Sequence, residues 1–430
     1  MPSRPPVPAA EERHGRMNRI TRRSALRRLA AGAAGLAAGQ RFAAAAAGTR
    51  PAATVPAAGP ILVEKQSTGS QIWQVTSEPF NQSNIYCEVP YCSRDGRYFI
   101  YERTDPNLEP NPCEFMVVEL GSFKQHRLDA AIGRRGCAIT HDGVFYYLKR
   151  IDADTCDILR ADLPVGAPKA VHRFRGTRNL SSLGTVSADH RYWAVGIPID
   201  GEKDLYGILL VDLERGTEAI IDRDPYIFNA HPQFNPGDGR QLMIQHNRGG
   251  WRQAEGRPAR TVGPEGATLY LLSVPDGRWT MLQVGKPYTT PITGHEAWAG
   301  TTDRIVLSVA PGGDYSIERG NLLVVRAGQK ARTLAGGYFF NHVGVSRCGR
   351  LFTGDDWRPP YKIVIGSVAT GRTAVVCESR TSGGRPQNTH PHAYLTPDFK
   401  WVIFNSDRGG FAHVHAASVP AGVVEDLLRT

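Results

Sequence analysis

The stretch SRDGRYFIY, residues 93–101, places a hydroxyl residue and an Asp-Gly pair directly before a run of aromatic and aliphatic residues. Asp-Gly between two apolar runs is typical of a tight hairpin, because both turn positions tolerate positive φ. Related phrases begin at positions 140, 187, 235, 301, 346 and 396, as THDGVFYYL, SADHRYWAV, NPGDGRQLMI, TTDRIVLSV, SRCGRLFTG and TPDFKWVIF. Each phrase therefore predicts a turn between two short strands.

The spacing of these phrases predicts the fold. Five of the six steps between successive starts are 45 to 50 residues long, and only the step from 235 to 301 is longer, at 66 residues. Each interval has room for about four short strands, and helical periodicity is almost absent. We therefore expect an all-β, seven-bladed β-propeller, since an open solenoid would need polar capping repeats that the sequence lacks. Residues 60–80 are expected to add outer strands to the last blade and so close the ring.

Positive charge is concentrated at the N-terminus. Residues 1–50 contain ten Arg and two Glu, so they carry +8 of the formal net charge of +10. The remainder is nearly balanced, which argues against nucleic acid as a partner. Arg22 and Arg23 precede an Ala/Leu/Gly run and then small residues, a pattern that resembles a twin-arginine export signal; a disordered basic arm is the alternative.

These features predict the organisation of the chain. We expect residues 1–47 to be a signal peptide and linker, and residues 48–430 to be a single propeller domain. The domain is expected to be periplasmic or secreted and to have no membrane anchor after cleavage, because no later stretch contains eighteen apolar residues. The long interval contains a Gly/Arg/Pro-rich insertion at residues 249–266, which is predicted to be a surface loop.

Five of the thirteen His occupy one register of the repeat. They lie six to eight residues before the turn Asp or the residue that replaces it, in four consecutive units: His231, His295, His342, His390 and His392. Because each turn joins an innermost strand to the next strand outward, this register places the five side chains at one mouth of the central channel. Chance placement does not favour such a register.

The stretch QNTHPHAYLTPD, residues 387–398, adds an amide to this set. Strand alternation puts His390 and His392 on the same face, and Gln387 lies directly upstream. Imidazoles with a side-chain carbonyl favour Mn²⁺, Zn²⁺ or Fe²⁺ over Ca²⁺. We therefore predict a metal site, although any one of these His, taken alone, is as compatible with a hydrogen-bonded residue of the channel wall.

Three segments also resemble a known family. HPQFNP, GHEAW and QNTHPHAYLTPDFKWVIFNSD, in this order on seven repeats, are similar to oligogalacturonate lyase, polysaccharide lyase family 22. The resemblance implies a lyase that cleaves 4-linked uronic-acid oligosaccharides by β-elimination. It also implies that His231 is the catalytic base and that Mn²⁺, or another divalent transition metal, is bound by His295, Gln387, His390 and His392.

Four further residues are candidates for substrate contacts. Arg134 and Arg135 occupy the same register in the second repeat, where they would bind the carboxylate of a second uronate or form a solvated loop pair. Arg248 is expected to approach the site from its rim. His342 is expected to hydrogen-bond the substrate or a metal ligand.

Two other classes of protein remain open. Propellers with Asp-Gly repeats also resemble TolB-type periplasmic scaffolds, which bind a protein partner at the channel mouth and catalyse nothing. A metal-dependent glycan hydrolase or epimerase would use the same His set. The predicted export and the insertion at residues 249–266 also leave the particular uronic acid open, so the resemblance indicates the chemistry more firmly than the sugar.

Overall fold

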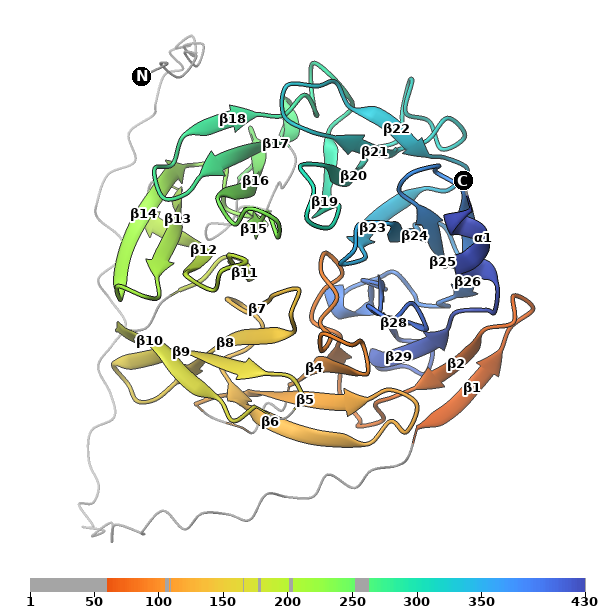
Figure 1. Cartoon of the computed structure of the whole chain (residues 1–430), viewed down its shortest axis with the longest axis horizontal. Coiled ribbons are helices and arrows are strands. Elements are labelled where there is room, and N and C mark those ends of the chain that lie inside the picture. Colours follow the sequence, from red (N-terminus) through yellow and green to blue (C-terminus); the bar gives the residue numbers. More distant parts are fainter. Residues whose placement is uncertain are drawn as a thin grey trace, which may run out of the picture. The chain divides into compact units, whose positions relative to one another are not determined.

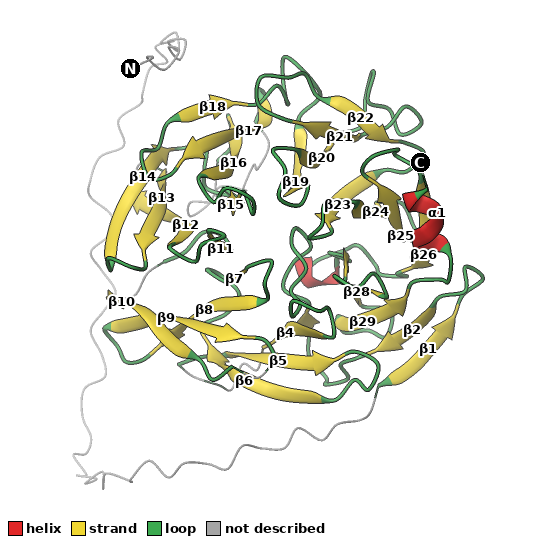
Figure 2. Ribbon diagram, in the orientation of Figure 1, coloured by secondary structure: helices red, strands yellow, loops and turns green. Residues whose placement is uncertain are grey.

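Seven antiparallel β-sheets are arranged around a ring in the computed structural model of the chain (Figure 1, Figure 2). The structure describes residues 60–104, 108, 110–164, 166–176, 179–200, 204–251 and 263–429. Within these ranges, strands make up nearly all regular structure, with one short 3₁₀ helix, η1 (Gln387–Thr389), and one short α-helix, α1 (Val423–Leu428). The predicted seven-bladed β-propeller is confirmed.

The first three blades each contain four consecutive strands, numbered from the centre of the ring outward. Blade one contains β3 (Gln82–Ser83), β4 (Tyr98–Thr104), β5 (Cys113–Glu119) and β6 (Gln125–Ala131). Blade two contains β7 (Ala138–Ile139), β8 (Val144–Arg150), β9 (Thr155–Asp162) and β10 (Lys169–Arg175). Blade three contains β11 (Gly184–Val186), β12 (Tyr192–Asp200), β13 (Leu205–Asp212) and β14 (Thr217–Asp224).

The next three blades repeat this order. Blade four contains β15 (Gln233–Phe234), β16 (Gln241–Arg248), β17 (Gly266–Ser273) and β18 (Trp279–Met281). Blade five contains β19 (Ile292–Trp298), β20 (Ile305–Val309), β21 (Leu322–Val325) and β22 (Arg332–Ala335). Blade six contains β23 (Phe340–Val345), β24 (Leu351–Asp356), β25 (Lys362–Ser367) and β26 (Thr373–Glu378).

Blade seven is built from both ends of the described chain. Its inner strands β27 (Tyr394–Leu395), β28 (Trp401–Ser406) and β29 (His413–Ser418) are followed outward by β2 (Gln71–Gln74) and β1 (Ile61–Lys65). Strands β2 and β29 are antiparallel, with Trp73 opposite Ala416. The expected closure by the N-terminal segment is confirmed, but it gives this blade five strands instead of the expected four.

The recurring phrase folds into a side-chain-stabilised turn. Its first residue donates a hydroxyl to the Asp two positions later, and in blades one, three and seven this carboxylate also accepts a backbone N–H two residues further on. The hydroxyl pairs are Ser93–Asp95 at 2.6 Å, Thr140–Asp142 at 2.5 Å, Ser187–Asp189 at 2.5 Å and Thr396–Asp398 at 2.7 Å. This bonding explains why the hydroxyl residue and the Asp recur together.

The hydrophobic core lies between neighbouring blades. Between blades two and three, for example, Leu148 of β8 packs in one buried cluster with Trp193 of β12 and Val211 of β13. The central strands are buried on both faces because each blade is covered by its two neighbours. The blades therefore form a rigid frame whose innermost strands and connecting loops are held in fixed positions at the channel.

Two sequence predictions fall on residues that the structure does not describe. The predicted signal peptide and linker, residues 1–47, lie outside the described ranges, as do residues 252–262 of the predicted surface insertion. Within the described ranges, no helix has the length and apolar character needed to cross a membrane.

Candidate functional site

Residues 84–91, which follow β3 and are here termed the channel loop, extend into the central channel. In Figure 1 this orange segment reaches toward the middle of the ring. At its start, the Asn84 side chain donates to the backbone oxygen of His392 at 2.7 Å, and the Asn84 N–H donates to the Asn405 side chain at 2.9 Å. These bonds attach a blade-one loop to blade seven, so that Tyr86 and Glu88 are fixed within the channel.

Arg347, from the turn that follows β23, fixes the other end of the channel loop. Its guanidinium donates to three backbone oxygens, those of Pro90 at 3.1 Å, Cys92 at 2.5 Å and Ser93 at 2.8 Å. Hydrogen bonds from a charged donor to neutral acceptors are among the stronger ones in proteins. The channel loop is therefore held by blades six and seven at its two ends.

Replacement of Arg347 by Met should destabilise the protein by about 3 kcal/mol, because three carbonyl groups lose a charged donor. The melting temperature measured by calorimetry should fall accordingly. Arg350→Met is the matched control on the same turn, since the exposed Arg350 lies over the Phe399 ring, with 5.6 Å between its Cζ atom and the ring centre, and beside Cys348. Equal effects of the two substitutions would show that Arg347 does not anchor the loop.

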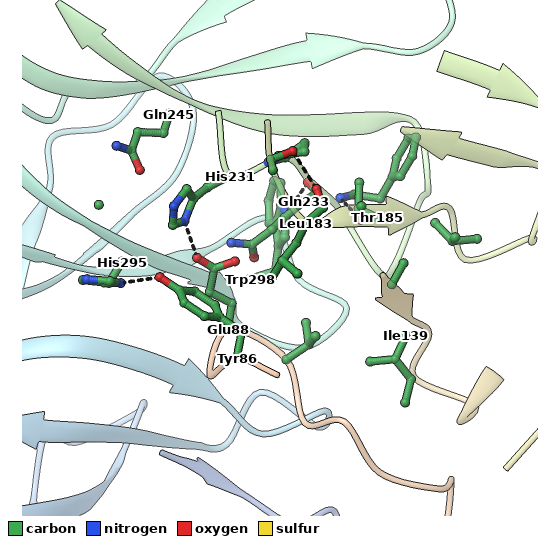
Figure 3. Close-up of a pocket in the computed structure, with 18 of the residues that line it drawn as sticks. Tyr86, Glu88, Ile139, Leu183, Thr185, His231, Gln233, Gln245, His295 and Trp298 are labelled. Carbon is green, nitrogen blue, oxygen red and sulfur yellow. Dashed lines mark hydrogen bonds and ion pairs between the residues drawn. The ribbon is translucent and has the colours of Figure 1, made fainter. Parts of the chain in front are cut away.

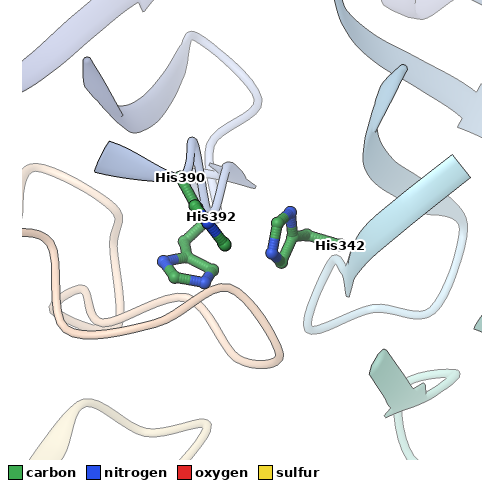
Figure 4. Close-up of side chains that lie close together, drawn as sticks. All are labelled: His342, His390 and His392. Atoms are coloured by element: carbon green, nitrogen blue, oxygen red, sulfur yellow. The ribbon is translucent and has the colours of Figure 1, made fainter. Parts of the chain in front are cut away.

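Three imidazoles from blades six and seven converge beside the channel loop (Figure 4). His342 lies on β23, whereas His390 and His392 follow η1, and one ring nitrogen of each lies within 4.8 Å of the others. The Nδ1 atom of His342 is 2.6 Å from a carboxylate oxygen of Asp355. Asp355 thereby orients the ring and leaves Nε2 for another partner, as second-shell carboxylates do for metal-binding His.

His392 is the most informative member of this cluster. Its side chain is fully buried, yet neither ring nitrogen has a hydrogen-bond partner among the described residues. Its backbone adopts φ of 42°, a left-handed conformation that costs energy for a residue with a side chain. A buried polar atom without a partner costs about 1–3 kcal/mol, so two such nitrogens in one ring indicate a missing ligand.

The charge state of the cluster favours a cation. Burial lowers the pKa of His392 well below its usual value, and the neighbouring His342 lowers it further. Burial and then His342 also lower the pKa of His390, whose Nδ1 atom has no hydrogen-bond partner among the described residues. Neutral imidazoles with free lone pairs are the form that binds metal ions. His342, His390 and His392 thus form a candidate site for a divalent transition metal.

The other two predicted ligands lie close to this cluster but outside it. His295, on β19, has its ring centre 4.3 Å from that of His342, and its Nδ1 atom is 3.2 Å from the hydroxyl of Tyr86. Gln387, in η1, is exposed and lines the neighbouring cavity. His342, which the sequence analysis treats as a substrate contact, takes a place among the three converging imidazoles.

A second cluster lies on the other side of Tyr86. The Nδ1 atom of His231 is 2.7 Å from a carboxylate oxygen of Glu88, and a carboxylate oxygen of Glu296 lies within 4.8 Å of both groups. Figure 3 shows the His231 ring directed at Glu88 and the Tyr86 hydroxyl directed at His295. His231, like His392, has φ of 42°. Two of the site's five His therefore have strained backbones, a feature that concentrates at functional sites.

The Glu88 carboxylate determines the protonation of His231. Burial alone would lower the pKa of His231, but the charge and hydrogen bond of Glu88, with a smaller effect of Glu296, outweigh it and raise that pKa to about 9. Burial, opposed by His231 and reinforced by Glu88, raises the pKa of Glu296 well above that of an exposed carboxylate. These shifts favour the protonated forms of His231 and Glu296 at neutral pH. The sequence analysis did not anticipate a protonated His231.

Glu88 and His231 of the second cluster line a cavity of about 580 Å³. His295 also lines it, and because the His295 ring centre is 4.3 Å from that of His342, the three converging imidazoles lie behind this part of the wall. A cavity of this size is in the range of small-molecule binding sites. Residues from blades two to five and from the channel loop form most of its wall. The lining residues most relevant to function are Tyr86, Glu88, Arg134, Arg135, His231 and His295.

The predicted arginines differ in their positions. Arg134 and Arg135 line the cavity, and Arg134 also donates to the backbone oxygen of Ile85 at 3.2 Å and lies 4.0 Å from a carboxylate oxygen of Glu102. Arg248, at the end of β16, does not line this cavity. Its guanidinium donates instead to three backbone oxygens of blade four and its loops, those of Glu265, Gly266 and Lys286.

The sequence analysis missed Tyr86, Glu88, Glu296 and Asp355. Glu88 and His231 are 143 positions apart, and Glu88 lies outside the repeated register on which the His were found. Glu296 directly follows His295, and Asp355 is the next-to-last residue of β24, which pairs with β23. The pairing of neighbouring strands would have indicated that Asp355 lies near His342, whereas the position of Glu88 depends on the path of the channel loop.

The fold and the site together define a class: a seven-bladed propeller with a candidate metal centre beside a cavity. No protein-family model matches the sequence, and no curated protein matches it. Solved structures do match. A structure described as oligogalacturonate lyase in complex with manganese has 18% sequence identity and a TM-score of 0.64, over 85% of this chain and 97% of that chain.

A second similar structure is the oligogalacturonate lyase of Vibrio parahaemolyticus. It has 16% identity and a TM-score of 0.60, over 84% of this chain and 96% of that chain. At these identities the likeness establishes a shared propeller fold that extends over almost the full length of both lyases. The activity and the bound metal belong to those proteins.

Proposed function

We propose that this protein is a metal-dependent lyase that cleaves 4-linked uronic-acid oligosaccharides by β-elimination. The observation that carries the proposal is the cluster of His342, His390 and His392, in which both ring nitrogens of His392 and Nδ1 of His390 have no hydrogen-bond partner among the described residues. His295, which packs against His342, lines the same cavity as His231. The similarity in fold to manganese-containing oligogalacturonate lyase supports Mn²⁺ as the cation. The Arg134 and Arg135 side chains give the cavity wall a positive charge suited to an anionic sugar.

The donor set fits a divalent transition metal, because it consists of three imidazoles, one of them oriented by a carboxylate. A cation held there would act as a Lewis acid toward the uronate carboxylate and offset the negative charge that develops when the C5 proton leaves. In the fold-related alternative, a scaffold that binds a protein partner, the unpartnered nitrogens of His392 have no explanation.

The protein's own residues account for the proton transfer. His231, in its deprotonated form, takes the C5 proton on Nε2, and the electrons of the C5–H bond form the C4=C5 double bond. The C4–O4 bond breaks with its electron pair on O4, and that oxygen takes a proton from solvent. The base and the candidate metal centre lie on two sides of Tyr86, whose ring centre is 5.7 Å from that of His231 and 4.6 Å from that of His392.

The reaction itself provides the test of the proposed function. Elimination conjugates the new double bond with the carboxylate, so we expect ultraviolet absorbance to rise when the protein is mixed with a panel of uronic-acid oligosaccharides, with oligogalacturonates first. EDTA should abolish the signal and added Mn²⁺ should restore it, because the cation offsets the charge of the transition state. Release of reducing ends without this absorbance would identify a hydrolase. No product from any glycan would contradict the proposal altogether.

A further inference from the structure

We propose that Glu88 is the positioning residue for His231, which it holds with Nδ1–H directed at the channel loop and Nε2 directed at the cavity. The inference rests on the proposed function, because it concerns the group that we expect to accept the C5 proton. It assigns a role to the channel loop, a segment that the repeat pattern of the sequence does not reveal.

The geometry of the pair supports this assignment. The Nδ1 atom of His231 and the Oε1 atom of Glu88 are 2.7 Å apart, and the two side chains are only 15% and 8% exposed. Within the described residues, no hydrogen bond is formed by Nε2 of His231, and the residue lines the cavity. A carboxylate accepts only, so a neutral His231 must carry its proton on Nδ1 and leave the Nε2 lone pair free.

The frame around Glu88 explains how the pair is held. Asn84 ties the start of the channel loop to blade seven, and Arg347 ties its end to blade six. His231 itself has a left-handed backbone, which turns its ring toward the loop. A buried acceptor on a segment fixed at both ends can select one tautomer and one ring orientation, as carboxylates do for catalytic His in other enzymes.

The same contact has a second consequence during proton transfer. When Nε2 takes the C5 proton, His231 becomes an imidazolium, and the adjacent, largely buried Glu88 carboxylate stabilises that charge. Glu88 therefore contributes an orientation, which any acceptor could supply, and a negative charge, which only a carboxylate supplies. The two contributions can be separated by substitution.

A different role for the same residues makes a distinct prediction. Glu88, His231 and Glu296 have ligand atoms within 4.8 Å of one another, and both carboxylate oxygens of Glu296 are buried without a hydrogen-bond partner among the described residues. Such a set could bind a second cation. In that case His231 would be a ligand, and the protein would contain two metal equivalents, one of them lost when Glu88 is replaced.

The test compares Glu88→Gln and Glu88→Ala with the full-length wild type. Gln retains an acceptor for Nδ1–H but no charge, whereas Ala removes both. We expect both variants to keep the wild-type metal content, with kcat lower on the order of 10²-fold or more and KM within about threefold, and with the larger loss for Ala. Asp224→Asn is the matched control, because Asp224 pairs with His246 at 3.1 Å outside the cavity, and its kcat should not change.

A spectroscopic readout separates positioning from general structural support. In zinc-loaded protein with ¹⁵N-labelled His, the neutral form of His231, assigned by comparison with His231→Gln, should be the Nδ1–H tautomer in wild type and in Glu88→Gln. The tautomer preference should be lost in Glu88→Ala. This experiment needs no substrate, so it tests the pair even if no uronide is cleaved and the proposed function fails.

Three results would overturn the assignment. An Nε2–H tautomer in the wild type, or a spectrum unchanged in Glu88→Ala, would show that Glu88 does not orient the ring. A wild-type kcat in Glu88→Ala, alongside an inactive His231 variant, would show that the contact has no catalytic consequence. Loss of one of two metal equivalents in Glu88→Gln would identify a second cation site instead.

Discussion

His392→Ala is expected to lose the divalent cation and, with it, the cleavage of uronic-acid oligosaccharides. His392 is fully buried, and both of its ring nitrogens lack hydrogen-bond partners among the described residues, so it has no evident role in the fold that would compete with metal binding. Loss of a direct ligand should weaken Mn²⁺ binding by well over the roughly 10–100-fold that is typical when a residue supporting a ligand is lost. Metal analysis and calorimetric titration with Mn²⁺ measure this change.

The control for this prediction is His415→Ala. His415, on β29 of the same blade, is also fully buried, and its Nε2 atom also has no hydrogen-bond partner in the described part of the chain, but it stacks on Phe404 away from the cavity. The His415→Ala variant should be less stable than the wild type but should keep the wild-type metal content. His390→Ala removes a half-buried candidate ligand and provides a second test in case the His392 variant does not fold. Retention of full metal content in both the His390 and His392 variants would remove this cluster from consideration.

His231→Ala is expected to retain the metal and to lose on the order of 10²-fold or more in kcat, the typical contribution of a general base. Its pairing with Glu88 places it outside the imidazole cluster, so metal content should match that of the wild type. Because Ala would leave the Glu88 carboxylate buried and unpaired, His231→Gln, which can still donate to Glu88, is the companion variant. Wild-type rates in both variants would show that the base lies elsewhere.

The pH dependence of the wild-type rate offers an independent readout. Glu88 and Glu296 together raise the pKa of His231 to about 9 against the opposing effect of burial. Since a base must be deprotonated to accept a proton, kcat/KM should rise with pH and level off only above the usual range of imidazole. An acidic limb at or below the ordinary imidazole pKa would argue against this environment for the catalytic base.

The sequence predicted the fold because its turns are encoded locally. A hydroxyl residue and an Asp two positions later bond to each other in four of the seven turns, so the pattern is visible without any knowledge of tertiary structure. The same register placed five His at one mouth of the channel. What the register could not show is which imidazoles converge: His342 joins His390 and His392, whereas His295 contacts Tyr86.

The remainder of the site depends on a loop that belongs to no repeat. Glu88 and Tyr86 reach the channel because residues 84–91 follow a path fixed by Asn84 and Arg347, through contacts that span more than 250 positions in sequence. No local pattern encodes such contacts. The raised pKa of His231 follows from its contact with Glu88 as well, so it could not be predicted from the sequence.

Blade seven closes the ring and also carries part of the candidate metal centre. Its strand β29 pairs with β2 from the opposite end of the described chain, and His390 and His392 lie just before β27. Two of the three candidate ligands are thus on the blade that is completed only when both ends of the propeller meet. By thermodynamic linkage, a cation that binds only the closed ring also stabilises the pairing of β2 with β29. A change that weakens this pairing should lower the affinity for the cation by the same factor.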